Sequence, residues 1–111
     1  MTPSDAPMEL SAVITTVGTP DDARRLVQAV LEQRLAACVQ IEPITSHYRW
    51  QGALHEESEL RLVCTTLPAV VPALLALLRA QHPYQLPQLV VQALQASQDY
   101  ADWVRQETRG A

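Results

Sequence analysis

The spacing of apolar residues changes from a strand pattern to a helical one within the first third of the chain. Residues 10–17 form a short β-branched run, which is typical of a buried strand. Thr19 can cap a helix, Pro20 suits a first helical position, and two aspartates follow where negative charge is favourable. Apolar residues then recur at helical spacing. This pattern predicts a strand over residues 10–17 and a helix from about residue 19 to residue 35.

A long hairpin is predicted next. Apolar and polar residues alternate over residues 36–51, a turn follows at Gln51-Gly52, and residues 54–66 form the returning strand. Pro43 interrupts the first strand, so we expect a bend or a free edge there. Beyond it Ile44, Ser46, Tyr48 and Trp50 share one face.

The rest of the chain predicts a helix over residues 68–81, a strand over 86–94 and a last helix capped by Ser97 or Asp99. Pro72 must lie in the first turn of its helix, which then stops at His82-Pro83. The predicted order is βαββαβ followed by a C-terminal helix. Right-handed crossovers place two helices on one face of a four-stranded antiparallel sheet, an α+β fold of the split βαβ type.

The predicted hairpin is longer than the helices can cover. Its tip would carry Ile44, Tyr48 and Trp50 into water in a single chain. An exposed apolar patch indicates a partner surface, and a projecting strand offers hydrogen-bonding groups to another chain. The pattern therefore predicts a homo-oligomer.

Composition limits the classes of function. With 111 residues the chain forms one domain, which we place at residues 9–111 after a disordered tail over residues 1–8. A net charge of −4 disfavours nucleic acid as a partner. The longest apolar run is too short to span a membrane. Two cysteines without a signal-peptide pattern predict a reduced, cytoplasmic protein.

Five short motifs, taken together, resemble one known family. RLAACVQI, SHYRWQG, ESEL, HPYQLP and DYADWV occur in the order and near the spacing of the CutA divalent-cation-tolerance family, over about residues 12–105. The resemblance implies a ferredoxin-like protomer with an extended hairpin (residues 36–51 and 54–66) and a tight homotrimer assembled through it, similar to the PII signalling trimers. It also implies a cytoplasmic role in tolerance of, or response to, copper or another divalent cation.

The chain departs from the family pattern at several positions. Thr65 stands where the family usually has a lysine, Gln88 replaces a glutamate, Gln40 an asparagine and Ser97 a glycine. Copper binding in some bacterial members is attributed to a cysteine and a His-His pair, and the matching positions here are Val17 and Gln81-His82. By resemblance, one of three candidate copper ligands remains.

Metal chemistry has weak local support. The candidate soft or borderline ligands form no close-spaced pair of the kind that marks a metal site: Cys38, Cys64, His47, His55 and His82. We interpret both cysteines as small buried hydrophobic residues. His82 is either a helix-terminating histidine or a site residue, so it is the first metal candidate and Cys38 the second.

The second constellation is Tyr48, Trp50, Glu59 and Tyr84, which by resemblance line a cleft between protomers. Aromatic rings with a carboxylate suit a small polar ligand, but they also suit interface packing. With no catalytic motif present, we expect a trimer that binds a metal or a small ligand without catalysis. The alternatives are a PII-like scaffold that binds a nucleotide or metabolite, and an enzyme using Glu59 and Tyr84.

Overall fold

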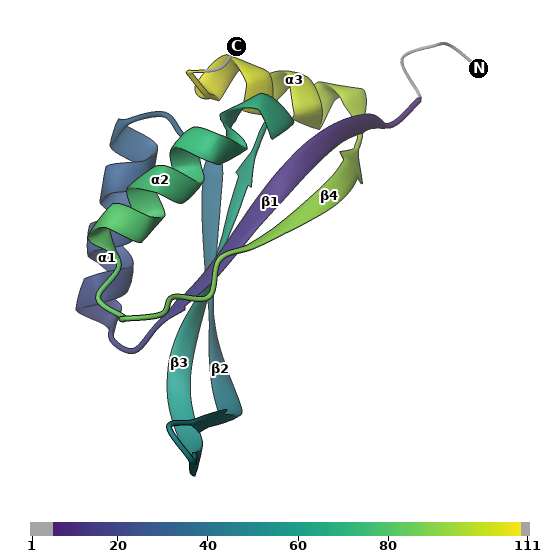
Figure 1. Cartoon of the computed structure of the whole chain (residues 1–111). Coiled ribbons are helices and arrows are strands. Elements are labelled where there is room, and N and C mark those ends of the chain that lie inside the picture. The colour runs from purple at the N-terminus through teal and green to yellow at the C-terminus, as the bar shows by residue number, and fades with distance from the viewer. Residues whose placement is uncertain (1–5, 110–111) are drawn as a thin grey trace.

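The chain folds into a four-stranded antiparallel sheet with helices packed against it (Figure 1). The computed structural model describes residues 6–109. The elements are β1 (Met8–Val17), α1 (Pro20–Glu32), β2 (Cys38–Trp50), β3 (Ala53–Thr66), the 3₁₀ turn η2 (Pro68–Val70), α2 (Val71–Gln81), β4 (Val90–Ala96) and α3 (Gln98–Glu107). The strand order β2-β3-β1-β4 is that of the ferredoxin-like arrangement. The predicted α+β fold class, with its βαββαβ order, is therefore confirmed.

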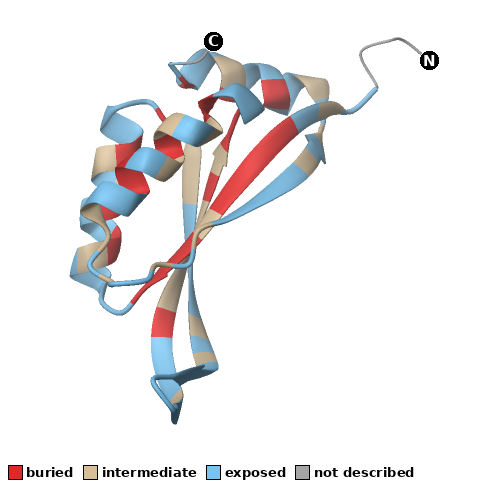
Figure 2. Cartoon of the chain, in the orientation of Figure 1, coloured by how far each residue is buried: buried red, intermediate tan, exposed pale blue. Residues whose placement is uncertain are grey.

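The core forms where α1 and α2 cover the sheet. Leu26 of α1, Leu74 and Leu78 of α2, and Val13 and Cys64 of the sheet are all fully buried. Figure 2 shows the buried residues along β1 and the helices, whereas the far end of the hairpin is mostly exposed. Since the helices cover only one end of β2 and β3, the rest of the hairpin projects beyond the core.

Strand register defines the projecting part of the hairpin. β2 pairs with β3 continuously from Cys38↔Thr65 to Trp50↔Ala53, but the pairing of β1 with β3 ends at Val17↔Leu60. Residues 53–59 of β3 therefore pair with β2 alone. Gln51 and Gly52 have φ angles of 50° and 80°, the left-handed values of a two-residue type I′ turn, which fits the twist of a hairpin.

Pro43 does not break the ladder, contrary to one of the two expectations. It stands opposite Leu60 with the register unbroken on both sides. β2 is the edge strand of the sheet that the described residues form, and an edge strand tolerates proline because no N–H is needed on its outer side. The free-edge expectation is the one that holds.

Several predicted boundaries shift. The first helix ends at Glu32, not Leu35, because Arg34 has a left-handed φ of 56°. β4 begins at Val90, so residues 86–89 are a loop that contains Pro87. Met8, assigned to the disordered tail, already pairs with Ala96, and residues 1–5 of that tail lie outside the described residues. No helix in residues 6–109 has the length and hydropathy needed to cross a membrane.

Candidate functional site

The four residues singled out in the sequence meet in one hollow of about 680 Å³. Tyr48 and Trp50 come from β2, Glu59 comes from β3, and Tyr84 comes from the loop between α2 and β4. The two strands place these side chains together because residues opposite each other in an antiparallel ladder share a face, and Ile44 stands opposite Glu59. A single chain thus supplies all four residues of the predicted cleft.

Glu59 is the most buried charged residue of this hollow. It is 9% exposed, and one of its carboxylate oxygens accepts a hydrogen bond from the Tyr84 hydroxyl at 2.6 Å. Burial, together with this bond to Glu59, raises the pKa of Tyr84, so the phenol remains a donor. Gly18 permits the arrangement, since a Cβ there would lie 3.3 Å from the Tyr84 hydroxyl oxygen.

A second carboxylate–phenol pair lies further along the hairpin. The Tyr48 hydroxyl donates to Glu57 at 2.8 Å, and the pKa of Tyr48 is raised, chiefly by that bond. The Tyr48 ring stacks on His55 with centroids 5.2 Å apart. Sequence reasoning missed Glu57 as a site residue, although its position two residues before Glu59 in a strand places both carboxylates on one face.

His82 lies behind Tyr84, and both of its ring nitrogens have partners. Nε2 lies 3.0 Å from the Thr16 carbonyl oxygen and 3.0 Å from the Thr15 hydroxyl, while Nδ1 accepts the Tyr84 backbone N–H at 3.1 Å. Because a carbonyl only accepts and an amide N–H only donates, Nε2 carries the proton and Nδ1 carries none. Burial is the main cause that lowers the pKa of His82. His82 is thus a neutral residue that positions Tyr84.

We expect stability to fall as the medium becomes acidic, because His82 must take up a proton that its site disfavours. With the folded pKa lowered, the contribution of neutral His82 is complete above its ordinary pKa of 6.5 and is lost as the pH falls through the lower folded-state value. Thermal unfolding followed between about pH 7.5 and about pH 5 should therefore show a shallower decline in Tm for His82→Gln than for the unaltered chain.

The matched control for this pH series is His47→Gln, which changes an exposed histidine of β2. It should retain the slope of the unaltered chain. Equal slopes for all three proteins would show that His82 protonation does not limit acid stability.

No group of three or more His, Cys, Asp or Glu side chains within residues 6–109 is arranged to hold a metal ion. Cys64 is fully buried as predicted, and burial, with a smaller effect of Cys38, raises its pKa to about 12. Cys38 is only half-buried, so its interpretation as a core residue was wrong; it begins an edge strand where little covers it. Within residues 6–109, neither His82 nor Cys38 belongs to a group of that kind.

The departures from the family pattern fall in three different environments. Gln88, which replaces the family glutamate, lines the hollow beside Tyr84. Thr65, in place of the lysine, pairs with Ala12 and Cys38 inside the sheet. Val17, in place of the cysteine, is fully buried. The hollow is thus altered at Gln88, and Val17 cannot ligate a metal.

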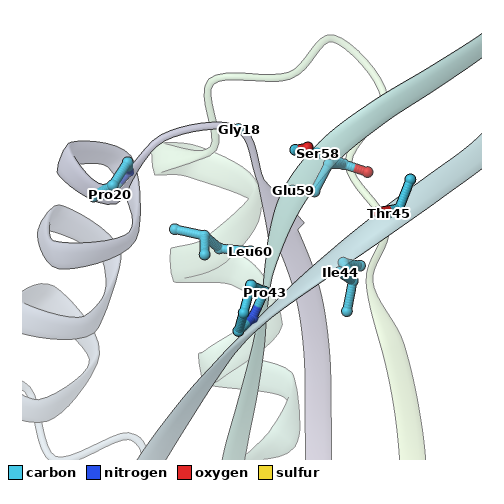
Figure 3. Close-up of a pocket in the computed structure, with 8 residues that line it drawn as sticks. All are labelled: Gly18, Pro20, Pro43, Ile44, Thr45, Ser58, Glu59 and Leu60. Atoms are coloured by element: carbon cyan, nitrogen blue, oxygen red, sulfur yellow. The ribbon is translucent and has the colours of Figure 1, made fainter.

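Glu59 also borders a smaller hollow of about 400 Å³ where α1 begins. Figure 3 shows Pro43, Ile44 and Thr45 on β2 facing Ser58, Glu59 and Leu60 on β3, with Pro20 at the start of the helix. Besides Glu59, its lining includes the hydroxyl-bearing residues Thr45 and Ser58. Glu59 therefore borders both this hollow and the larger aromatic one.

Comparison with known proteins gives a consistent result. The model of the "CutA1 divalent ion tolerance protein" family matches residues 11–107. The divalent-cation tolerance protein CutA of Thermus thermophilus is 41% identical over 98 residues, 86% of this chain and 95% of that protein. Protein CutA of Homo sapiens is 38% identical over 92% of this chain, which spans only 58% of the human protein's length.

Solved structures agree with the sequence comparison. CutA of Synechococcus elongatus PCC7942 is 42% identical, covers 92% of each chain and superposes with a TM-score of 0.87. A second structure of that protein, in complex with a Bis-Tris molecule, covers 92% of this chain and 96% of its own, at 40% identity and a TM-score of 0.84.

Proposed function

Because this chain belongs to the CutA1 divalent ion tolerance family, we propose that it acts in divalent-cation tolerance as a homotrimer. Each cleft between subunits binds a metal ion, copper among them, or a small ligand, without catalysis. The observation that carries the proposal is the hollow formed by Tyr48, Trp50, Glu59 and Tyr84 on a hairpin that projects from the core.

The projecting hairpin supports assembly through its exposed apolar residues and free edge. Ile41 is 46% exposed, Tyr48 38%, Trp50 36% and Leu54 77%. Among residues 6–109, no strand pairs with the outer side of β2, so the hydrogen-bonding groups there can pair with a strand of another copy. Burying these side chains at a subunit interface removes apolar surface from water.

Ligand binding is supported by the size and lining of the hollow. A volume of about 680 Å³ lies within the range of small-molecule sites, roughly 300–1,000 Å³. The relative from Synechococcus elongatus has been crystallised with Bis-Tris, a small organic molecule. The two carboxylates of the lining, Glu57 and Glu59, favour a cation over the phosphates of a nucleotide.

The proposed location is the cytoplasm, where thiols stay reduced. Both cysteines are free, and the register places Cys38 opposite Thr65, the neighbour of Cys64, so the two thiols point to opposite faces of the sheet.

Catalysis is not proposed, because Tyr84 is held as a neutral donor to Glu59 and His82 as a positioning group, which leaves no activated nucleophile among them.

We expect copper or zinc to raise the Tm of the trimer in a thermal-shift titration. Ligand at 100 times its Kd stabilises a folded protein by about 2.7 kcal/mol. If the ion binds at the hollow, the rise should be lost in Glu59→Gln and kept in Glu56→Gln, which removes the same charge from an exposed position outside the lining. A rise with nucleotides alone would favour the PII-like alternative, and no rise with any divalent ion would remove the metal part of the proposal.

A further inference from the structure

The hollow combines three aromatic rings with two carboxylates, a lining that few metal sites have. Tyr48, Trp50 and Tyr84 supply the rings, and Glu57 and Glu59 supply the charge. From this combination we infer that the hollow binds a small organic ammonium ion, such as an alkylated amine. The inference rests on the ligand-cleft part of the proposed function and names the chemical class of that ligand.

Glu59 is the first support, because it is a nearly buried carboxylate without a cationic partner in residues 6–109. Its one hydrogen bond there comes from the neutral Tyr84 hydroxyl, and it forms no ion pair within 4.0 Å. A carboxylate removed from water is unfavourable unless a positive charge or several donors compensate. Since Glu59 lines the hollow, a cation inside it would provide that compensation.

The charge of the remaining lining points the same way. Glu57 accepts from Tyr48 and has the His55 imidazole at 3.9 Å as its nearest basic group. Neither arginine nor lysine is present among the residues that line the hollow in the described part of the chain. Gln88 and Ser46 add neutral polar groups that suit a ligand hydroxyl or N–H. The hollow therefore carries net negative charge.

The aromatic rings decide between an organic cation and a metal ion. Copper and zinc need two to four converging nitrogen, sulfur or oxygen ligands, and no group of three or more His, Cys, Asp or Glu side chains in residues 6–109 is arranged to hold an ion. An ammonium group whose charge is spread over attached carbons is instead attracted to the faces of tryptophan and tyrosine. Trp50 and Tyr48 are about one-third exposed, so part of each side chain is accessible to such a ligand.

Choline and its uncharged carbon analogue 3,3-dimethyl-1-butanol form the matched probe pair, since they share a shape and differ in charge. We expect choline to bind the intact trimer at least about tenfold more tightly than the analogue, as measured by titration of backbone amide chemical shifts. The shifted amides should cluster around Tyr48, Glu59 and Tyr84.

Glu59→Gln should weaken choline binding about tenfold, because it removes the charge while conserving the shape. Glu56→Gln is the matched control: it removes the same charge from an exposed position of the same strand, opposite His47, outside the lining. The oligomeric mass of each variant is measured in parallel, so that weaker choline binding caused by loss of the trimer is distinguished from weaker binding caused by loss of the charge.

Three outcomes would overturn the inference: equal affinity for choline and its analogue, choline binding that survives Glu59→Gln, or shifts located away from the hollow. Zinc or copper binding that is lost in Glu59→Gln, without choline binding, would also overturn it, yet would leave the proposed function intact. A monomeric protein that still binds choline would have the opposite meaning: the assembly would be wrong and the ligand class right.

Discussion

Replacing Trp50 with alanine is expected to shift the protein from trimer to monomer at low concentration. Trp50 lies at the end of β2, beyond the reach of the helices, and is 36% exposed in the single chain. In the proposed trimer a neighbour covers part of that indole surface, while the part that lines the hollow stays open to a ligand. Truncating a buried interface anchor costs at least about 2 kcal/mol, and three equivalent interfaces are affected at once.

The matched control for Trp50 is Trp103→Ala. Trp103 is 41% exposed, lies on α3 rather than on the hairpin, and packs against Tyr100 with ring centroids 5.7 Å apart. Analytical ultracentrifugation over a dilution series should show dissociation of Trp50→Ala at concentrations where Trp103→Ala and the unaltered chain remain assembled. Identical dissociation of both variants would mean that Trp50 is not an anchor.

Replacing Leu26 with alanine is expected to lower the free energy of unfolding by about 2–5 kcal/mol. Leu26 is fully buried in α1, within the same core cluster as Val13, Leu74 and Leu78. Alanine removes that contact and leaves a cavity that the packed sheet and helices fill only in part. Chemical denaturation at a fixed protein concentration measures the loss, since assembly also contributes to stability.

Leu31→Ala provides the control in the same helix. Leu31 is 40% exposed, so its truncation removes less buried surface than that of the fully buried Leu26, while the change in helix propensity is the same. We expect a loss below about 1 kcal/mol for Leu31→Ala. Equal losses for the two variants would contradict the placement of the core on the Leu26 side of α1.

Much of the fold could be predicted because its signals are local. Three of these signals each span only a few residues: the alternation in the long strands, the proline and aspartates at the start of α1, and the Gln51-Gly52 turn. The end of α1 was missed because a left-handed Arg34 gives no sequence signal comparable to glycine. The start of β4 was missed because the apolar residues before Val90 continue the strand pattern through a loop.

The sequence singled out four residues of the hollow, but it missed Glu57, and it included His82, which does not line the hollow. Tyr48, Trp50, Glu59 and Tyr84 stood out as residue types, and strand register then joined the first three. His82, two residues before Tyr84, accepts the Tyr84 backbone N–H, and the Tyr84 hydroxyl donates to Glu59. Such a contact joins segments more than 20 residues apart, and nothing in the local sequence encodes it.

The mass of the protein in solution tests the central proposal most directly. Size-exclusion chromatography with multi-angle light scattering, at micromolar concentration, should give three times the 12.3 kDa mass of the chain. A single-chain mass would contradict the proposed trimer, and with it the assignment of the exposed hairpin residues to a subunit interface.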